Sequence, residues 1–166
     1  AESIADLIED GGGAIAADSG GNSFSVSAQV LQPDLLTGLK VWSEVLLRPV
    51  FPGGEVAREI ERQIAALKQQ EDHPSFIAFR ELRRALYGNH PFALNREGTP
   101  ASLATLTPET LRAFHAARVV SGNAVLSVFG NVHFGEIRDL IAASFDGIAS
   151  GNRQEGGSLP ALPVHE

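Results

Sequence analysis

The sequence predicts an α+β fold in which helices pack on one face of a mostly antiparallel sheet. Strict alternation of apolar and polar residues in FSVSAQV, residues 24–30, indicates a strand with one wet face. Apolar residues then recur at helical spacing in several later segments. NAVLSVFG, residues 123–130, is an apolar run typical of a central strand buried on both faces. Because so few strands make a thin sheet for so many helices, we expect further strands outside this segment, upstream of it.

The first elements are a short helix and a hairpin. Residues 3–10 place apolar side chains on one side and end at the glycines 11–13, which tolerate left-handed dihedral angles. Residues 13–18 are small and apolar, and a turn-forming cluster at 19–22 separates them from the alternating strand. We therefore expect these two strands to pair antiparallel.

Helices follow, separated by proline and glycine. Their apolar stripes are Leu35, Leu39, Trp42 and Leu46; Val56, Ile60, Ile64 and Leu67; Phe76, Phe79, Leu82 and Leu86; and Phe134, Ile137, Ile141 and Phe145. The spacing predicts that Trp42 lies in the core. Thr107-Pro108-Glu109 is a helix start, with threonine as the N-cap and proline at the first position.

The chain of 166 residues is long enough for one domain or for a large piece of a bigger protein. Residues 148–166 are polar and rich in glycine and proline, which indicates a linker or strap. We therefore expect an α+β domain at residues 1–147, as a fragment of a larger chain, and a strap at 148–166 that leads to a following domain.

The net charge of −7 and the pI near 5.2 argue against nucleic acid or an anionic membrane as a partner. The sequence has no apolar run long enough to cross a bilayer and no basic-then-apolar layout of a signal peptide at its start. It has no cysteine, which excludes thiolate metal ligands and cysteine nucleophiles.

The residues alone reveal no recognisable active site. None of the histidines is spaced for a zinc-binding helix, and the glycine-rich stretches lack the layout of a phosphate-binding loop. His73 and His90, each before a proline, are interpreted as hydrogen-bonding turn residues rather than as ligands or bases. Glu59, Glu61 and Glu71 are interpreted as part of a solvated, charged helix face.

Several segments resemble the insulinase/pitrilysin-type zinc metallopeptidases. The most specific are LYGNHPF with the EGTP that follows it, the LTPETLRAFH helix, and the strand that ends in GNV at residues 130–132. The resemblance runs over about residues 3–147. It implies a zinc site with two ligands on a His-x-x-Glu-His helix, which would lie upstream of this segment, and a glutamate on a later helix.

By the register of that family, the glutamate ligand falls on Ala66. Alanine has no lone pair to offer, and Ala65 and Leu67 cannot replace it. The resemblance therefore implies the non-catalytic counterpart of the zinc-binding domain, with no catalytic residue, no metal ligand and no cofactor of its own. Zinc is expected instead in the catalytic half of the protein or in a partner.

The resemblance also points to a peptide-binding strand. Active members place Asn-Ala where this sequence has Ala16-Ala17, so a side-chain amide near the substrate backbone is lost. An extended peptide can still pair with backbone groups by adding to a strand edge. The expected edge strand is Gly13, Ala14, Ile15, Ala16 and Ala17.

The resulting hypothesis is a non-catalytic, peptidase-like domain of a bacterial zinc metalloendopeptidase that closes the proteolytic chamber and helps to hold peptide. Its partners would be other domains of the same peptidase or an active partner subunit, and its compartment the periplasm or the cytoplasm. Two alternatives stay open. One is a structural core-type subunit of the same fold without a peptidase role. The other is an active zinc peptidase with a misaligned ligand, in which Glu59, Glu61 or Glu71 would serve.

Overall fold

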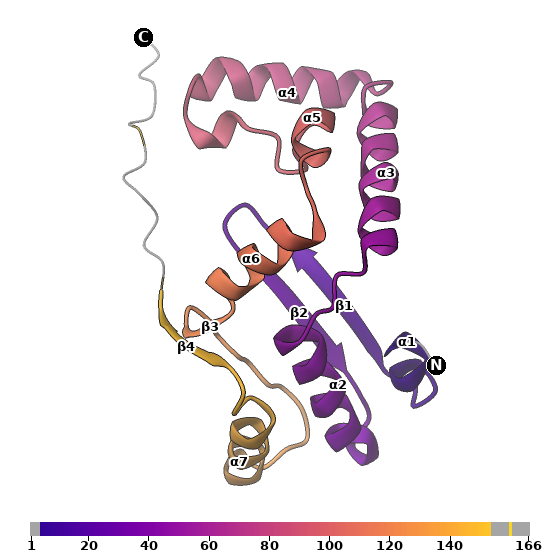
Figure 1. The fold of residues 1–166 in the computed structure, drawn as a ribbon, viewed down its shortest axis with the longest axis vertical. Helices are drawn as coiled ribbons and strands as arrows, with labels where there is room; N and C mark the ends of the chain where they lie inside the picture. The colour runs from indigo at the N-terminus through magenta and orange to yellow at the C-terminus, as the bar shows by residue number, and fades with distance from the viewer. Residues whose placement is uncertain (1–3, 154–159, 161–166) are drawn as a thin grey trace. The chain divides into compact units, whose positions relative to one another are not determined.

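The computed structural model describes residues 4–153 and residue 160. This part of the chain falls into two compact units (Figure 1). The first holds the described residues up to Val50 together with His115–Arg153, and the second holds Phe51–Phe114. Each unit is described by itself.

The first unit begins with helix α1, Ile4–Glu9, and a hairpin of strands β1, Ala14–Ser19, and β2, Phe24–Gln29. The strands pair antiparallel, with Ala14 opposite Gln29 at one end and Ser19 opposite Phe24 at the other. The Gly20 amide donates to the Ser23 carbonyl at 2.7 Å and closes the turn. The predicted short helix and hairpin are therefore confirmed.

Helix α2, Leu35–Leu47, follows the 3-10 turn η1, Gln32–Asp34, and packs against the hairpin. The Trp42 indole donates to the Val26 carbonyl at 2.9 Å, and its ring meets Phe145 edge-on at 5.3 Å between centroids. A half-buried tryptophan commonly combines an apolar body with a satisfied N–H in this way. The prediction that Trp42 lies in the core holds only in part, because its side chain packs on Phe145 but stays half-buried.

The remainder of the first unit contains a second strand pair. Strand β3, Val120–Gly122, runs parallel to β4, Ala149–Asn152, and helix α7, Phe134–Ser144, connects them. Parallel neighbours require such a crossover, since a tight turn can join only antiparallel strands. The beginning of the expected strap at 148–166 is thus strand β4, and most of its remainder lies outside the described residues. The division of the chain at residue 147 stays a prediction.

The predicted central strand at 123–130 is wrong for this structure. Residues 124–129 form no regular element, and the side chains of Val125 and Phe129 are 96% and 94% exposed. A strand requires a neighbour for its backbone groups, and no described residue supplies one here.

The second unit consists of helices and turns. It contains α3, Gly53–Gln70; α4, Pro74–Tyr87; the 3-10 turn η2, Pro91–Ala93; and α5, Pro100–Leu103. Helix α6, Pro108–Arg118, begins in this unit and ends in the first. The Thr107 hydroxyl accepts from the Thr110 amide at 3.2 Å, as predicted for a threonine N-cap.

Few side chains are deeply buried in the described part of the chain. The buried apolar residues are Ile8, Leu39, Leu67, Leu103, Val119, Val120 and Ile137. The predicted stripe of α4 forms, but Phe79, Leu82 and Leu86 on it are exposed. The helices in the described residues are too short or too polar to span a bilayer.

Candidate functional site

Ala66 lies in the last third of α3 and is half-buried. Its neighbour Leu67 is only 6% exposed, so this turn of the helix faces the interior of its unit. Gln63 and Gln70 stand one turn before and one turn after it, on the same side of the helix. The position at which the family resemblance places a glutamate is therefore flanked by two amide side chains.

Both amides hold the loop that contains Glu97. The Gln63 side chain donates to the Glu97 carbonyl oxygen at 3.3 Å, and the Gln70 side chain donates to the Glu97 carboxylate at 2.7 Å. The second bond is charge-assisted, and such bonds are shorter and stronger than neutral ones. This face of α3 is therefore engaged in a structural contact within the second unit.

The glutamates that could replace a missing ligand do not converge. The Arg62 guanidinium donates to both carboxylate oxygens of Glu59, at 2.8 and 2.5 Å, and these hydrogen bonds lower the pKa of Glu59. The Glu71 carboxylate lies 3.8 Å from the Arg80 guanidinium. Glu61 is exposed. These side chains form the solvated, charged face expected from the sequence.

The described residues contain no group of three or more histidine, aspartate, glutamate or cysteine side chains placed to hold a metal ion. Catalytic zinc needs about three protein ligands around one open position. On α3, the side chain at 66 offers no donor atom, and Glu59 is engaged with Arg62. At the position where the resemblance places a zinc ligand, the side chain on this helix therefore supplies no donor atom.

The two histidines that precede prolines, His73 and His90, make contacts typical of turn residues. His90 is buried, its Nδ1 accepts a hydrogen bond from the Phe92 amide at 3.1 Å, and its ring packs 4.5 Å from that of Phe92. His73 is exposed and lies just before α4, where its carbonyl accepts from the Phe76 amide at 3.0 Å. Both fit the interpretation of turn residues.

The expected peptide-binding strand lies at β1, and its backbone directions follow from the turn. Gly20 and Ser23 are a hydrogen-bonded pair. Such pairs alternate along an antiparallel ladder with pairs whose backbone groups point away from the partner strand. Counting from the turn, Ile15 and Ala17 of β1 therefore point their N–H and C=O groups outward. The carbonyl of Val26, opposite Ala17, is turned outward in the same way and accepts from Trp42.

The other members of the expected strand are already engaged. The Gly13 amide donates to the Ile8 carbonyl at 2.9 Å, and the alternation turns Ala14 and Ala16 toward β2. Within the described residues, no hydrogen bond to the outward groups of Ile15 or Ala17 is present. The free edge of β1 thus offers two residues, which together present two donors and two acceptors to an extended peptide.

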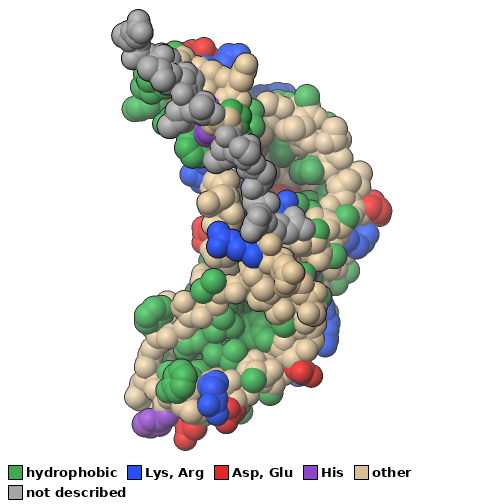
Figure 2. Space-filling view, turned by 90° about the vertical axis from the view of Figure 1, so that its left-hand side faces the viewer, with side chains coloured by type: hydrophobic (Ala, Val, Ile, Leu, Met, Phe, Trp, Pro, Cys, Tyr) green, Lys and Arg blue, Asp and Glu red, His purple; other side chains and the backbone are tan. Residues whose placement is uncertain are grey.

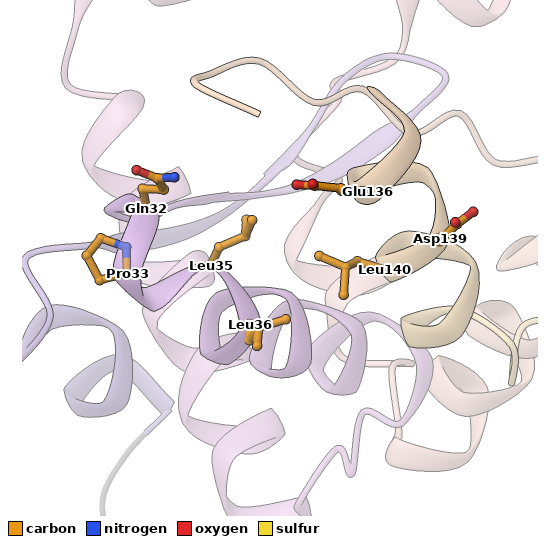
Figure 3. Close-up of a pocket in the computed structure, with 7 residues that line it drawn as sticks. All are labelled: Gln32, Pro33, Leu35, Leu36, Glu136, Asp139 and Leu140. Atoms are coloured by element: carbon orange, nitrogen blue, oxygen red, sulfur yellow. The ribbon is translucent and has the colours of Figure 1, made fainter. Parts of the chain in front are cut away.

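An open hollow of about 640 Å³ lies between the start of α2 and α7 (Figure 3). Leu35 and Leu36 from α2 face Leu140 of α7, and Glu136 and Asp139 stand on the α7 side. No local pattern in the sequence predicts this hollow. The residues that line it from α2 and from α7 are about a hundred positions apart in the sequence, so short-range periodicity does not indicate that they lie close together. Glu97 was missed for the same reason, because its partners lie in a distant helix.

Several known proteins are similar to this chain in sequence or in fold. No family model matches the chain. An uncharacterized zinc protease of Rickettsia felis is 24% identical over 97% of this chain, and the uncharacterized zinc protease YmxG of Bacillus subtilis is 27% identical over 84% of it. The chain spans 39% and 34% of the length of these two relatives.

Solved structures of related proteins have a similar fold. The peptidase M16 inactive domain from Pseudomonas fluorescens matches 95% of this chain with a TM-score of 0.88 and 27% identity, over 39% of its own length. Pitrilysin matches 96% of this chain with a TM-score of 0.80 and 14% identity, over 18% of its own length, which shows the fold alone. A chain of complex III2 from Candida albicans has the same fold, with a TM-score of 0.71 and 19% identity over 96% of this chain and 40% of that one. By fold and sequence the chain resembles the insulinase/pitrilysin-like (M16) peptidases, and in particular the inactive domain of that family.

Proposed function

We propose that this chain belongs to the non-catalytic, peptidase-like domain of a zinc metalloendopeptidase, where it closes the proteolytic chamber and helps to hold the peptide substrate. The free edge of β1 carries the proposal, because Ile15 and Ala17 direct their backbone groups away from β2. A strand edge binds an extended peptide through main-chain hydrogen bonds, without any catalytic side chain. The alanine at position 66, which has no donor atom to offer a metal ion, supports the non-catalytic half of the proposal.

The amide of Ala17 tests the peptide-holding role. Ala17→Pro removes one outward donor and leaves the ladder to β2 in place, since proline is tolerated where the N–H of an edge strand faces outward. One lost hydrogen bond is worth about 0.5–1.5 kcal/mol, so we expect KM for a peptide substrate to rise roughly 2- to 10-fold at unchanged kcat. The measurement is steady-state kinetics on the full-length protein together with its zinc-binding domain or partner.

Ala17→Ser is the matched control, because it keeps both the small size and the N–H of residue 17. Its KM should equal that of the unmodified protein. An unchanged KM in Ala17→Pro, with circular dichroism showing an intact fold, would reject peptide pairing at this edge.

The glutamates of α3 test the non-catalytic role. Glu59→Ala, Glu61→Ala and Glu71→Ala, each made in the full-length protein, should leave the zinc content and peptidase activity unchanged, because these carboxylates are exposed or paired with arginine. The measurement is zinc per protein by elemental analysis, alongside kcat. If one of them removed zinc and activity together, that glutamate would be the ligand and the segment would be catalytic.

Co-purification separates this proposal from the structural alternative. A zinc-binding peptidase partner or domain is the expected companion. Recovery with a membrane redox complex and without peptidase activity would instead favour a core-type subunit. The higher TM-score and identity of the M16 inactive domain, compared with the complex III2 chain, favour the first.

A further inference from the structure

The hollow between the start of α2 and α7 combines an apolar lining with an acidic group. Leu35 and Leu36 line it from α2 and Leu140 lines it from α7, and Leu36 is 64% exposed. The Glu136 carboxylate points across the opening toward the side on which Gln32 lies (Figure 3). Figure 2 shows hydrophobic side chains gathered in the lower part of that view, at the height at which Figure 1 draws α2 and α7.

The two acidic residues of the lining differ in their surroundings. The Arg138 guanidinium donates twice to one carboxylate oxygen of Asp139, at 2.9 Å each, and in Figure 3 the Asp139 side chain points away from the hollow. Within the residues that the structure describes, no hydrogen bond or ion pair engages the Glu136 side chain, and no lysine or arginine is among the lining residues. Glu136 therefore presents an unneutralised negative charge beside the leucines of the hollow.

We propose that this hollow binds a peptide segment in which an arginine or a lysine stands next to apolar residues. The cationic group would pair with Glu136, and the aliphatic stem together with an apolar neighbour would cover Leu35, Leu36 and Leu140. Arginine and lysine suit both parts of the site, because each carries a charged end on a long apolar stem. This inference goes beyond the proposed function, because it uses no residue of the β1 edge.

The open form of the hollow favours a peptide over a small molecule. Pockets for small molecules usually bury roughly 70–90% of their ligand, whereas this hollow of about 640 Å³ is open to solvent. An extended chain can enter and leave such a hollow at its sides while its side chains fill the interior. The net charge of −7 on the chain further favours a basic partner, since complementary charge accelerates the encounter.

Binding of a short fluorescent peptide with one arginine between two leucines tests the proposal. Fluorescence anisotropy gives Kd for the full-length protein, with zinc chelated so that any peptidase activity leaves the probe intact. Glu136→Gln keeps the shape of the side chain and removes its charge, so Kd should rise about 3-fold, as expected for an exposed ion pair. Leu36→Ser removes apolar contact and should raise Kd about 5-fold.

Two controls isolate the charge of Glu136. Glu109→Gln removes the same charge, also from the first turn of a helix, but at a residue that does not line the hollow, and it should leave Kd unchanged. A probe with citrulline in place of arginine keeps the shape and loses the charge, so Glu136→Gln should no longer change its Kd.

Three outcomes would overturn the proposal. Equal Kd values for Glu136→Gln and Glu109→Gln would mean that Glu136 does not pair with the peptide. If Ala17→Pro weakened binding of this probe as much as Glu136→Gln does, the peptide would lie on the edge of β1 instead of in the hollow. If butylguanidinium alone displaced the probe at the concentration at which the unlabelled peptide does, the hollow would be a site for small cations.

Discussion

Replacement of Gly13 by alanine should cost the hairpin about 3 kcal/mol of local stability, at the upper end for an added methyl group in a packed site. The new Cβ would lie 2.6 Å from the Gln29 carbonyl oxygen, 3.0 Å from the Ile8 carbonyl oxygen and 2.9 Å from the Ile8 Cγ2. Two of these atoms are backbone, so no rotamer change relieves the overlap. The end of α1 or the start of β1 has to move.

Hydrogen exchange on peptides that cover residues 14–29 of the full-length protein measures this loss as a lower free energy of opening. Gly21→Ala, in the hairpin turn, is the matched control, because a Cβ there meets no atom within 4 Å. It should leave exchange within about 0.5 kcal/mol of the unmodified protein. Equal effects of the two substitutions would contradict the close packing of Gly13. Because β1 starts beside Gly13, the same variant should also weaken peptide binding at that edge.

The second large effect concerns Gly38, where α2 meets the residue that follows β2. Alanine there would place Cβ 2.7 and 2.9 Å from the two methyl carbons of Val30. Alanine is the better helix former, by about 1 kcal/mol, so propensity alone predicts stabilisation. The steric overlap with Val30 outweighs this gain in helix propensity. We therefore expect Gly38→Ala to destabilise the hairpin and α2 by about 2 kcal/mol.

A double-mutant cycle isolates the cause. Val30→Ala removes both methyl groups that meet the new Cβ, so the double variant should be at least about 1 kcal/mol more stable than the sum of the two single changes. Hydrogen exchange of α2 and the hairpin in the full-length protein supplies the four free energies. If the free-energy changes of the two single variants simply added in the double variant, the destabilisation by Gly38→Ala would have a cause other than the overlap with Val30.

The local elements were predictable because local patterns specify them. Alternation at 24–30 and the turn cluster at 19–22 gave the hairpin, and apolar spacing gave α2, α3 and α7. The interpretation of His90 as a turn residue was also available from its place before Pro91. These features depend on neighbours within a few residues, and a single sequence contains that information.

The sequence-based predictions that were wrong depend on contacts between residues that are distant in sequence. The run 123–130 has strand composition, yet residues 124–129 have no neighbour in the described chain and stay unpaired. Helix α4 has its predicted stripe, but Phe79 is 65% exposed because no described element covers it. Parallel pairing of Val120 with Ala149, and the hold of Gln70 on Glu97, join segments that no local pattern links.

The sequence by itself determined the main helices and the β1–β2 hairpin, the resemblance to a peptidase family, and the alanine at position 66, since side-chain chemistry and short-range periodicity are local properties of the chain. Only the tertiary structure decided what surrounds that alanine, which backbone groups of β1 face outward, and which apolar side chains remain bare. Those properties depend on the approach of segments far apart in sequence, and pairing and burial exist only once both partners are in place.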